Sequence, residues 1–257
     1  MTEFTFNCFL LAMTILAVVV FISLFFVDAG YGKFYTKKWG PAVGNRLGWI
    51  LMESPVFIAM LCFCLFSDRK DDIVRLVIFL IFQLHYFQRA FVFPFLIRGN
   101  SKMPLSIILM GVVFNTLNAC MQGGWIFFIS PSDYYGQGLE WIYSPQFIVG
   151  TVIFLTGMTI NMQSDYIIRH LRAPGDTKHY LPKGGMFNYV TSANYFGEFT
   201  EWIGFAILSW SLSGLVFAIW TFANLAPRAA KIYNRYKSEF PDEFNEKKLK
   251  RIIPFIL

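Results

Sequence analysis

Long apolar runs separated by short polar connections dominate this chain. No Asp, Glu, Lys, Arg or His occurs between Phe4 and Val27, and about 20 such residues are enough for a helix to cross the hydrocarbon core of a bilayer. No basic segment precedes this run and it exceeds the apolar part of a secretion signal, so we expect it to be a retained span. Further apolar runs occupy residues 49–66, 74–97, 105–129 and 145–162.

The stretch 186–226 is also apolar, although three polar residues interrupt its first half. Basic residues orient the chain, because they favour the cytosolic side. The loop 28–48 carries four, the loop 130–144 carries none, and eight of the 22 Lys and Arg follow Pro227. Five crossings from the outside bring residue 163 into the cytosol, so a single further crossing would leave the basic tail outside. We therefore predict two crossings within 186–226, with a turn at 211–214.

The predicted fold is all-α: one integral membrane domain, 1–257, with seven transmembrane helices, an external N-terminus and a cytosolic C-terminus. Only 15% of the residues are charged and 56% are hydrophobic, whereas a soluble domain has about a quarter charged. The net charge of +6 reflects basic residues beside membrane spans, so we expect contacts with membrane lipids and no nucleic acid. The cysteines lie in apolar runs without a CxxC pair, and no metal site is expected: Cys8, Cys62, Cys64 and Cys120.

Charged and polar side chains recur inside the apolar runs at helical spacing. A charge near the bilayer centre costs about 2.5–3.5 kcal/mol, so such side chains face a cavity or a partner. The pattern predicts a hydrated cavity near the cytosolic side, although contacts between helices are an alternative for each residue alone. We take His85 by itself for a packing histidine whose hydrogen bonds are satisfied by neighbouring residues. The groups are Glu53; Gln83, His85, Tyr86 and Arg89; Asn161, Asp165, Arg169 and Arg172; and Asn194, Glu198 and Glu201.

These residues alone leave a membrane enzyme, a transporter and a receptor open, since no glycine-rich dinucleotide loop is present. The segment 182–206 reads PKGGMFNYVTSANYFGEFTEWIGFA, and shorter motifs lie at 30–33, 53–55, 85–89, 161–175 and 253–255. In this order they resemble the steroid 5-alpha-reductase (3-oxo-5-alpha-steroid 4-dehydrogenase) family over essentially the whole chain.

The resemblance implies a seven-helix membrane enzyme that reduces the carbon 4–5 double bond of 3-oxo-Δ4-steroids to 5α-steroids by hydride transfer from NADPH to carbon 5. Glu53 and Tyr86 match the catalytic pair that binds the steroid 3-carbonyl, where a phenol and a protonated acid would stabilise an enolate. Helices within 1–130 would hold the steroid, and the half 145–257 would bind NADPH. Positions matching the cofactor site are Asn161, Asp165, Arg172, Asn194, Glu198 and Tyr236, with Arg89, Arg98 and Tyr31 as further members.

Two positions depart from vertebrate members of the family. Ile232 replaces a cofactor-side histidine, and Tyr180 replaces an arginine. The alternatives are a related reductase of trans-2-enoyl-CoA or a polyprenol, a lipid transporter or receptor, and a methyltransferase of prenylated cysteine. We expect the hydrophobic substrate to enter from the lipid of a bacterial inner membrane or the endoplasmic reticulum, with the cofactor site facing the cytosol. No obligate protein partner is expected.

Overall fold

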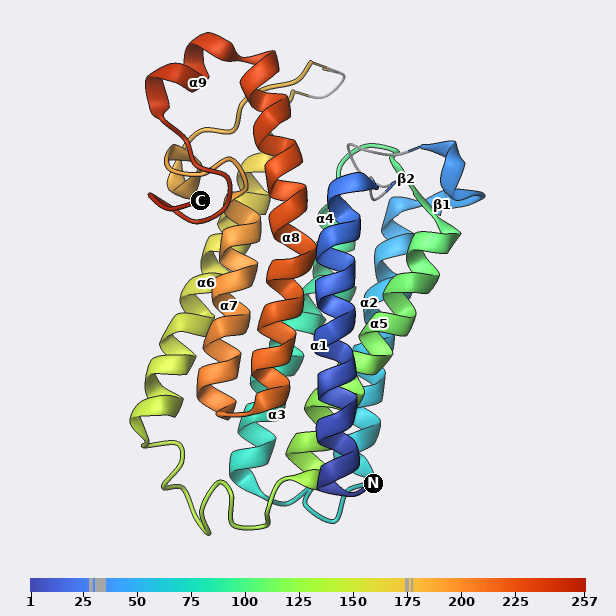
Figure 1. The fold of residues 1–257 in the computed structure, drawn as a ribbon, viewed down its shortest axis with the longest axis vertical. Helices are drawn as coiled ribbons and strands as arrows, with labels where there is room; N and C mark the ends of the chain where they lie inside the picture. Colours follow the sequence, from blue (N-terminus) through green and yellow to red (C-terminus); the bar gives the residue numbers. More distant parts are fainter. Residues whose placement is uncertain (28–29, 31–35, 174–175, 177) are drawn as a thin grey trace.

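The computed structural model describes residues 1–257 except 28–29, 31–35, 174–175 and 177 (Figure 1). Long helices run side by side as a bundle, and the two ends of the chain lie at opposite ends of it. The long helices are α1 (Glu3–Phe26), α2 (Asn45–Leu65), α3 (Ile73–Phe87), α5 (Leu105–Gly124), α6 (Pro145–His170), α7 (Ala193–Ser209) and α8 (Leu212–Glu239).

Among the described residues, five helical stretches are long and apolar enough to cross a membrane. They coincide with the five apolar runs of the first 170 residues, so that prediction is confirmed: Glu3–Phe26, Asn45–Leu65, Ile73–Leu96, Leu105–Ile129 and Pro145–His170. Large apolar side chains such as Leu11, Ile15 and Ile22 are exposed on α1, as expected where a helix faces lipid rather than water. The chain is a multi-pass membrane protein.

The stretch 186–226 forms two helices, as predicted, but the turn lies earlier than 211–214. Helix α7 ends at Ser209, and Trp210 takes a left-handed conformation with φ of 46°. The Ser211 hydroxyl accepts a hydrogen bond from the Gly214 amide and thereby caps the start of α8. Ser211 therefore begins a helix rather than a turn. Whether α7 and α8 both cross the membrane, and in which direction, stays a prediction.

Glycines hold α6 and α7 in close contact. A Cβ atom at Gly157 would lie 2.3 Å from the Glu201 amide nitrogen, and one at Gly204 would lie 2.3 Å from the Phe154 nitrogen. Only glycine permits this approach of the two backbones, a packing typical of membrane helices. The polar side chains at 161, 165, 198 and 201 are therefore carried by one closely packed helix pair.

Short elements complete the fold. Two of the long helices continue through a π-helical turn, α3 through η3 (Gln88–Val92) into α4 (Phe93–Leu96) and α5 into η4 (Trp125–Ile129). Strand β1 (Ala42–Gly44) pairs antiparallel with β2 (Lys102–Pro104), with Val43 opposite Met103, so the all-α prediction omitted this small sheet. The remaining elements are the 3₁₀ turns η2 (Lys37–Trp39) and η5 (Gly185–Asn188) and helix α9 (Pro241–Lys247).

The C-terminal segment is tied to the start of α7. The Thr191 amide donates to the Lys250 carbonyl at 2.9 Å, and the Lys250 amide donates to the Tyr189 carbonyl at 2.9 Å. These bonds form an isolated parallel bridge between Val190 and Lys250. They restrain the backbone immediately before Asn194, a predicted cofactor residue.

Candidate active site

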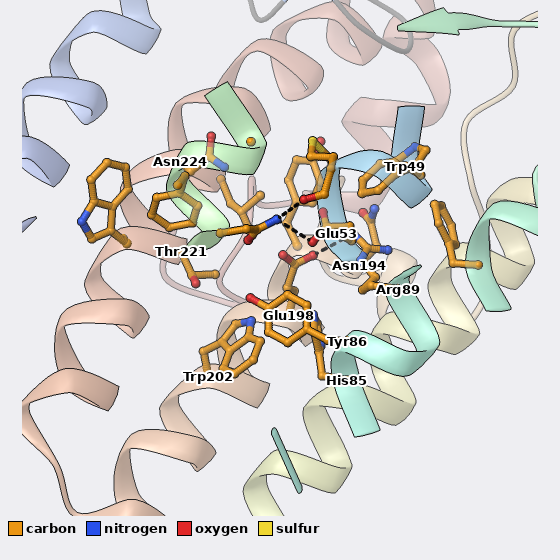
Figure 2. Close-up of a pocket in the computed structure, with 18 of the residues that line it drawn as sticks. Trp49, Glu53, His85, Tyr86, Arg89, Asn194, Glu198, Trp202, Thr221 and Asn224 are labelled. Atoms are coloured by element: carbon orange, nitrogen blue, oxygen red, sulfur yellow. Dashed lines mark hydrogen bonds and ion pairs between the residues drawn. The ribbon is translucent and has the colours of Figure 1, made fainter. Parts of the chain in front are cut away.

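A cavity of about 250 Å³ lies inside the bundle, between side chains of α2, α3, η3, α4, α5, α6, α7 and α8 (Figure 2). This volume is near the lower end of the range for small-molecule sites. Aromatic side chains form much of its wall, namely Trp49, Phe93, Phe114, Trp202, Phe217 and Trp220. Polar groups enter the same space, namely Glu53, His85, Tyr86, Arg89, Asn115, Asp165, Asn194, Glu198, Thr221, Asn224 and Arg228.

Arg89 joins two of the helices that line the cavity. Its Nη1 atom lies 3.2 Å from Asp165 Oδ2 on α6, and its Nη2 atom lies 3.2 Å from Glu198 Oε2 on α7. The guanidinium carbon is 4.9 Å from the Trp49 ring centroid and 4.8 Å from that of Phe93, distances that favour cation–π attraction. Arg89 belongs to the π-helical turn η3, a local distortion often found at functional sites.

Glu53 and Tyr86 both direct their polar ends into this cavity (Figure 2). The Asn115 amide donates to Glu53 Oε2 at 3.1 Å and to the Met52 carbonyl at 2.7 Å. The Asn118 amide donates to the Tyr86 hydroxyl oxygen at 2.9 Å. Each predicted catalytic side chain is thus held by an amide on α5.

His85 has a buried hydrogen-bond partner. Its Nδ1 atom lies 2.8 Å from Glu201 Oε1, and both side chains are buried. The ring of His85 also lines the cavity, whereas Glu201 lies behind it. The second carboxylate oxygen of Glu201 has no hydrogen-bond partner among the described residues. The sequence marked both positions as polar but did not indicate that they contact each other.

Two asparagines extend the polar group between α6 and α7. The Asn161 amide donates to the Asn194 carbonyl at 2.9 Å, and the Asn194 amide donates to Asp165 Oδ1 at 3.4 Å. Asn194 and Asp165 line the cavity, while Asn161 is buried beside them. The predicted stripes on these two helices therefore face each other.

Comparison with known proteins gives this arrangement a context. The sequence profile of the 3-oxo-5-alpha-steroid 4-dehydrogenase family matches residues 101–257. The mouse protein 3-oxo-5-alpha-steroid 4-dehydrogenase 1 is 39% identical over 245 residues, covering 94% of this chain and 93% of its own length. Steroid 5-alpha-reductase DET2 of Gossypium hirsutum is 37% identical over 257 residues, covering 98% of this chain and 97% of its own. The chain belongs to the 3-oxo-5-alpha-steroid 4-dehydrogenase family.

Membership in this family confirms the resemblance read from the sequence motifs and makes the chain an oxidoreductase. It excludes the transporter, receptor and methyltransferase alternatives. Steroid 5-alpha-reductase DET2 of Arabidopsis thaliana is a more distant relative, 33% identical over 91% of this chain and 90% of its own length. Among the described residues, no group of three or more His, Cys, Asp or Glu side chains could hold a metal ion.

Arg172, Tyr236 and Arg98, which are also expected for this family, are not among the residues that line the cavity. Arg172 is exposed just beyond α6. Tyr236 is buried on α8 in a cluster with Leu181 and Phe244, and its burial raises its pKa to about 12, against the opposing charges of Arg235 and Arg172. The charge of Arg172 thus acts on Tyr236, and the last turns of α6 and α8 lie at the end of the bundle that carries the C-terminus (Figure 1).

Arg98 docks onto the end of α6, with Nη2 2.9 Å from His170 Nε2 and Nη1 3.4 Å from the Arg169 carbonyl. Tyr31 lies outside the described residues. At the two departures from vertebrate members, Ile232 packs against the cluster around Tyr236, and the Tyr180 hydroxyl donates to Asp176 Oδ2 at 2.6 Å. Their contacts with a cofactor stay untested.

Sequence reasoning missed the polar residues of α5. Asn115, Asn118 and Gln122 are spaced i, i+3, i+7, a helical spacing similar to the i, i+4, i+7 spacing on α7, and this pattern was a usable signal. Thr221, Asn224 and Arg228 on α8 also line the cavity without having been predicted.

Proposed function

We propose that this enzyme reduces the carbon 4–5 double bond of 3-oxo-Δ4-steroids to 5α-steroids, with NADPH as the hydride donor. The observation that carries the proposal is the convergence of Glu53 and Tyr86 on one cavity, each anchored by an amide of α5. The names of the relatives support the substrate class.

The two side chains suit the charge that forms on the substrate. Reduction at carbon 5 of an enone moves electron density onto the 3-oxygen, which becomes an enolate. The Tyr86 hydroxyl and a protonated Glu53 would donate hydrogen bonds to this oxygen, and donors fixed in advance stabilise such a charge strongly in a site that excludes water. Aromatic walls such as Trp202 and Phe217 offer a flat apolar surface for steroid rings. A proton from water completes carbon 4.

The residues between α6 and α7 fit NADPH. Asp165 and Glu198 present carboxylate acceptors, and Asn194 an amide, to the cavity. Ser192, at the start of α7, has a buried hydroxyl for which the described part of the chain provides no hydrogen-bond partner, so a polar group of a ligand would satisfy it. Arg172 would hold a phosphate, since a guanidinium group binds phosphate through paired donors. When bound, NADPH supplies the hydride that adds to carbon 5.

The membrane arrangement belongs to the same proposal. Seven crossings with the C-terminus in the cytosol would give Arg172 and Tyr236 access to cytosolic NADPH, and the exposed apolar faces would let a steroid enter from the lipid. In this division, the helices within 1–130 hold the steroid and the half 145–257 holds the cofactor.

Product analysis of the detergent-solubilised protein tests the proposal. With progesterone or testosterone and NADPH, mass spectrometry should detect the 5α-reduced product from the wild-type protein. Glu53→Met and Tyr86→Phe each remove a donor, so each should lower turnover by about 100-fold or more, while NADPH still raises the thermal midpoint. Tyr134→Phe is the matched control, because its hydroxyl bonds the Trp210 carbonyl, remote from the cavity, and its turnover should equal that of the wild type.

Wild-type turnover in both variants would contradict the role of this pair. Reduction of trans-2-enoyl-CoA or a polyprenol, without any steroid product, would instead place the chain's substrate among those alternatives.

A further inference from the structure

A chain of buried amides leads from the start of α8 to the Tyr86 hydroxyl. The Gln122 Nε2 atom donates to the Ser213 carbonyl at 2.9 Å and to Asn118 Oδ1 at 3.2 Å. Asn118 Nδ2 donates to the Tyr86 hydroxyl oxygen at 2.9 Å. Asn118 is 0% exposed and Gln122 is 1% exposed, and both lie behind Tyr86 rather than in the wall of the cavity.

The direction of every bond in this chain follows from its fixed end. A backbone carbonyl only accepts, so Gln122 must turn its NH₂ group towards Ser213. The second hydrogen of that NH₂ group points at Asn118, which must therefore present its oxygen to Gln122 and its own NH₂ group to Tyr86. The Tyr86 oxygen is then an acceptor on this side, and its single hydrogen is available on the side of the cavity.

We infer that Asn118 and Gln122 are positioning residues that commit Tyr86 to donate its hydroxyl hydrogen to a carbonyl oxygen in the cavity. This inference rests on the proposed function, because a carbonyl acceptor is what a 3-oxo-steroid provides. Without the fixed direction, a tyrosine hydroxyl can rotate and donate to a neighbouring acceptor, and it then meets the substrate with its lone pairs. A hydrogen bond donated to the phenol oxygen also polarises its O–H bond, as in other hydrogen-bond chains.

If Asn118 and Gln122 only stabilised the fold, their loss would not affect carbonyl recognition. Gln83 provides the comparison for such a structural role. This residue lies on α3, one helical turn before Tyr86, and it is also buried. Its amide donates to the Phe57 carbonyl at 3.0 Å, away from Tyr86. Loss of the Gln83 amide should therefore affect stability alone, whereas loss of the Asn118 or Gln122 amide should also affect carbonyl recognition.

The affinity of the NADP⁺-bound protein for progesterone tests the inference without requiring turnover. Asn118→Asp has nearly the same shape but only accepts when ionised, so it would take the Tyr86 hydrogen. We expect it to weaken progesterone binding about tenfold, the typical value of one hydrogen bond. Gln122→Met removes the donor that orients Asn118, so the Asn118 amide is free to rotate. Progesterone binding should then weaken about threefold, because only part of the free energy of the same hydrogen bond is lost. Gln83→Met should bind like the wild type.

A double variant separates positioning from general damage. In a Tyr86→Phe background there is no hydroxyl to orient, so Asn118→Asp should weaken binding no further. An NADP⁺-induced rise in thermal midpoint verifies folding of each variant, and Gln122→Met carries the test if Asn118→Asp does not fold. Wild-type affinity for progesterone in the folded Asn118 and Gln122 variants would overturn the positioning role of these residues but not the proposed function. The same conclusion would follow if Asn118→Asp weakened progesterone binding equally in the Tyr86→Phe background. Absence of progesterone binding by the wild-type protein would overturn the proposed function, and the positioning role of Asn118 and Gln122 with it.

Discussion

Two arginines on one continuous helical path have different surroundings. Arg75, at the start of α3, is 0% exposed. Its Nε atom lies 2.9 Å from Asp72 Oδ2, and its Nη atoms donate to the Ser130 hydroxyl and to the carbonyls of Ile126, Pro131 and Ser132. Arg89, on η3, instead faces two carboxylates and two aromatic rings in the wall of the cavity.

The difference separates a structural group from a site. Apart from Nε, which donates to Asp72, the donors of Arg75 end on backbone and hydroxyl oxygens that hold the segment after α5 against α3. The Tyr135 ring covers the guanidinium group at 5.1 Å. For Arg89, the hydrogen bonds recorded within the described residues engage Nη1 and Nη2, both with carboxylates that also line the cavity. A ligand can exchange such contacts, whereas the contacts of Arg75 are part of the fold.

The largest expected effect on stability is therefore that of Arg75→Met. Removing this guanidinium leaves several buried acceptors without a donor, and breaking a buried ionic network costs about 3–5 kcal/mol. Thermal unfolding in detergent should show the loss, while the fraction that remains folded should bind NADPH as the wild type does. A wild-type midpoint for Arg75→Met would contradict the structural role.

Arg89→Met should reverse the balance between stability and function. Water in the cavity can solvate Asp165 and Glu198, so the free energy of unfolding should fall by only about 1–2 kcal/mol. NADPH affinity and turnover should fall at least tenfold, a loss of about 1.4 kcal/mol or more. Arg89→Lys keeps the charge but not the paired geometry, so it should recover the stability more fully than the turnover. Unchanged NADPH affinity and turnover in Arg89→Met would contradict the role of Arg89 in the site and would leave it, like Arg75, with a structural role only.

Sequence patterns predicted most of this fold because the membrane imposes them. A long apolar run has few solutions other than a spanning helix, and all five such runs were predicted. Their bounds agree closely except that the second helix begins at Asn45 rather than 49 and the fifth continues to His170 rather than 162. The sheet was missed because Ala42–Gly44 and Lys102–Pro104 pair across a long separation in sequence, which periodicity does not report. The turn between α7 and α8 was misplaced because Ser211 resembles a turn residue as much as a helix cap.

The sequence predicted the site residues whose charge is costly in a membrane, but it did not predict which residues pair with each other. Glu53, Arg89, Asp165 and Glu198 all line the cavity, since ionisable groups in apolar runs face a cavity or a partner. Neutral amides are common between membrane helices, so Asn118 did not stand out by residue type. The pairing of His85 with Glu201 and the buried network of Arg75 depend on contacts between distant segments. Composition and spacing carry no information about those contacts.

A third arginine, Arg235, extends the comparison to the surface. Loss of its ion pair should have the smallest effect on stability. Arg235 Nε lies 2.8 Å from Glu239 Oε1 on the exposed last turns of α8, and this hydrogen bond lowers the pKa of Glu239 below its ordinary value. Glu239→Gln should cost under about 1 kcal/mol at pH 7, because water screens exposed pairs.

The sign of the pH dependence follows from the direction of that shift. A lowered folded-state pKa means that the ion pair stabilises the protein above the ordinary carboxyl pKa of about 4.3. This contribution disappears as the pH falls through the folded-state pKa, where Glu239 becomes protonated in both states. Thermal midpoints of the wild type and Glu239→Gln should therefore differ slightly at neutral pH and converge in acid. A difference that persists or grows in acid would show that Glu239 stabilises α8 through packing rather than through the charge of Arg235.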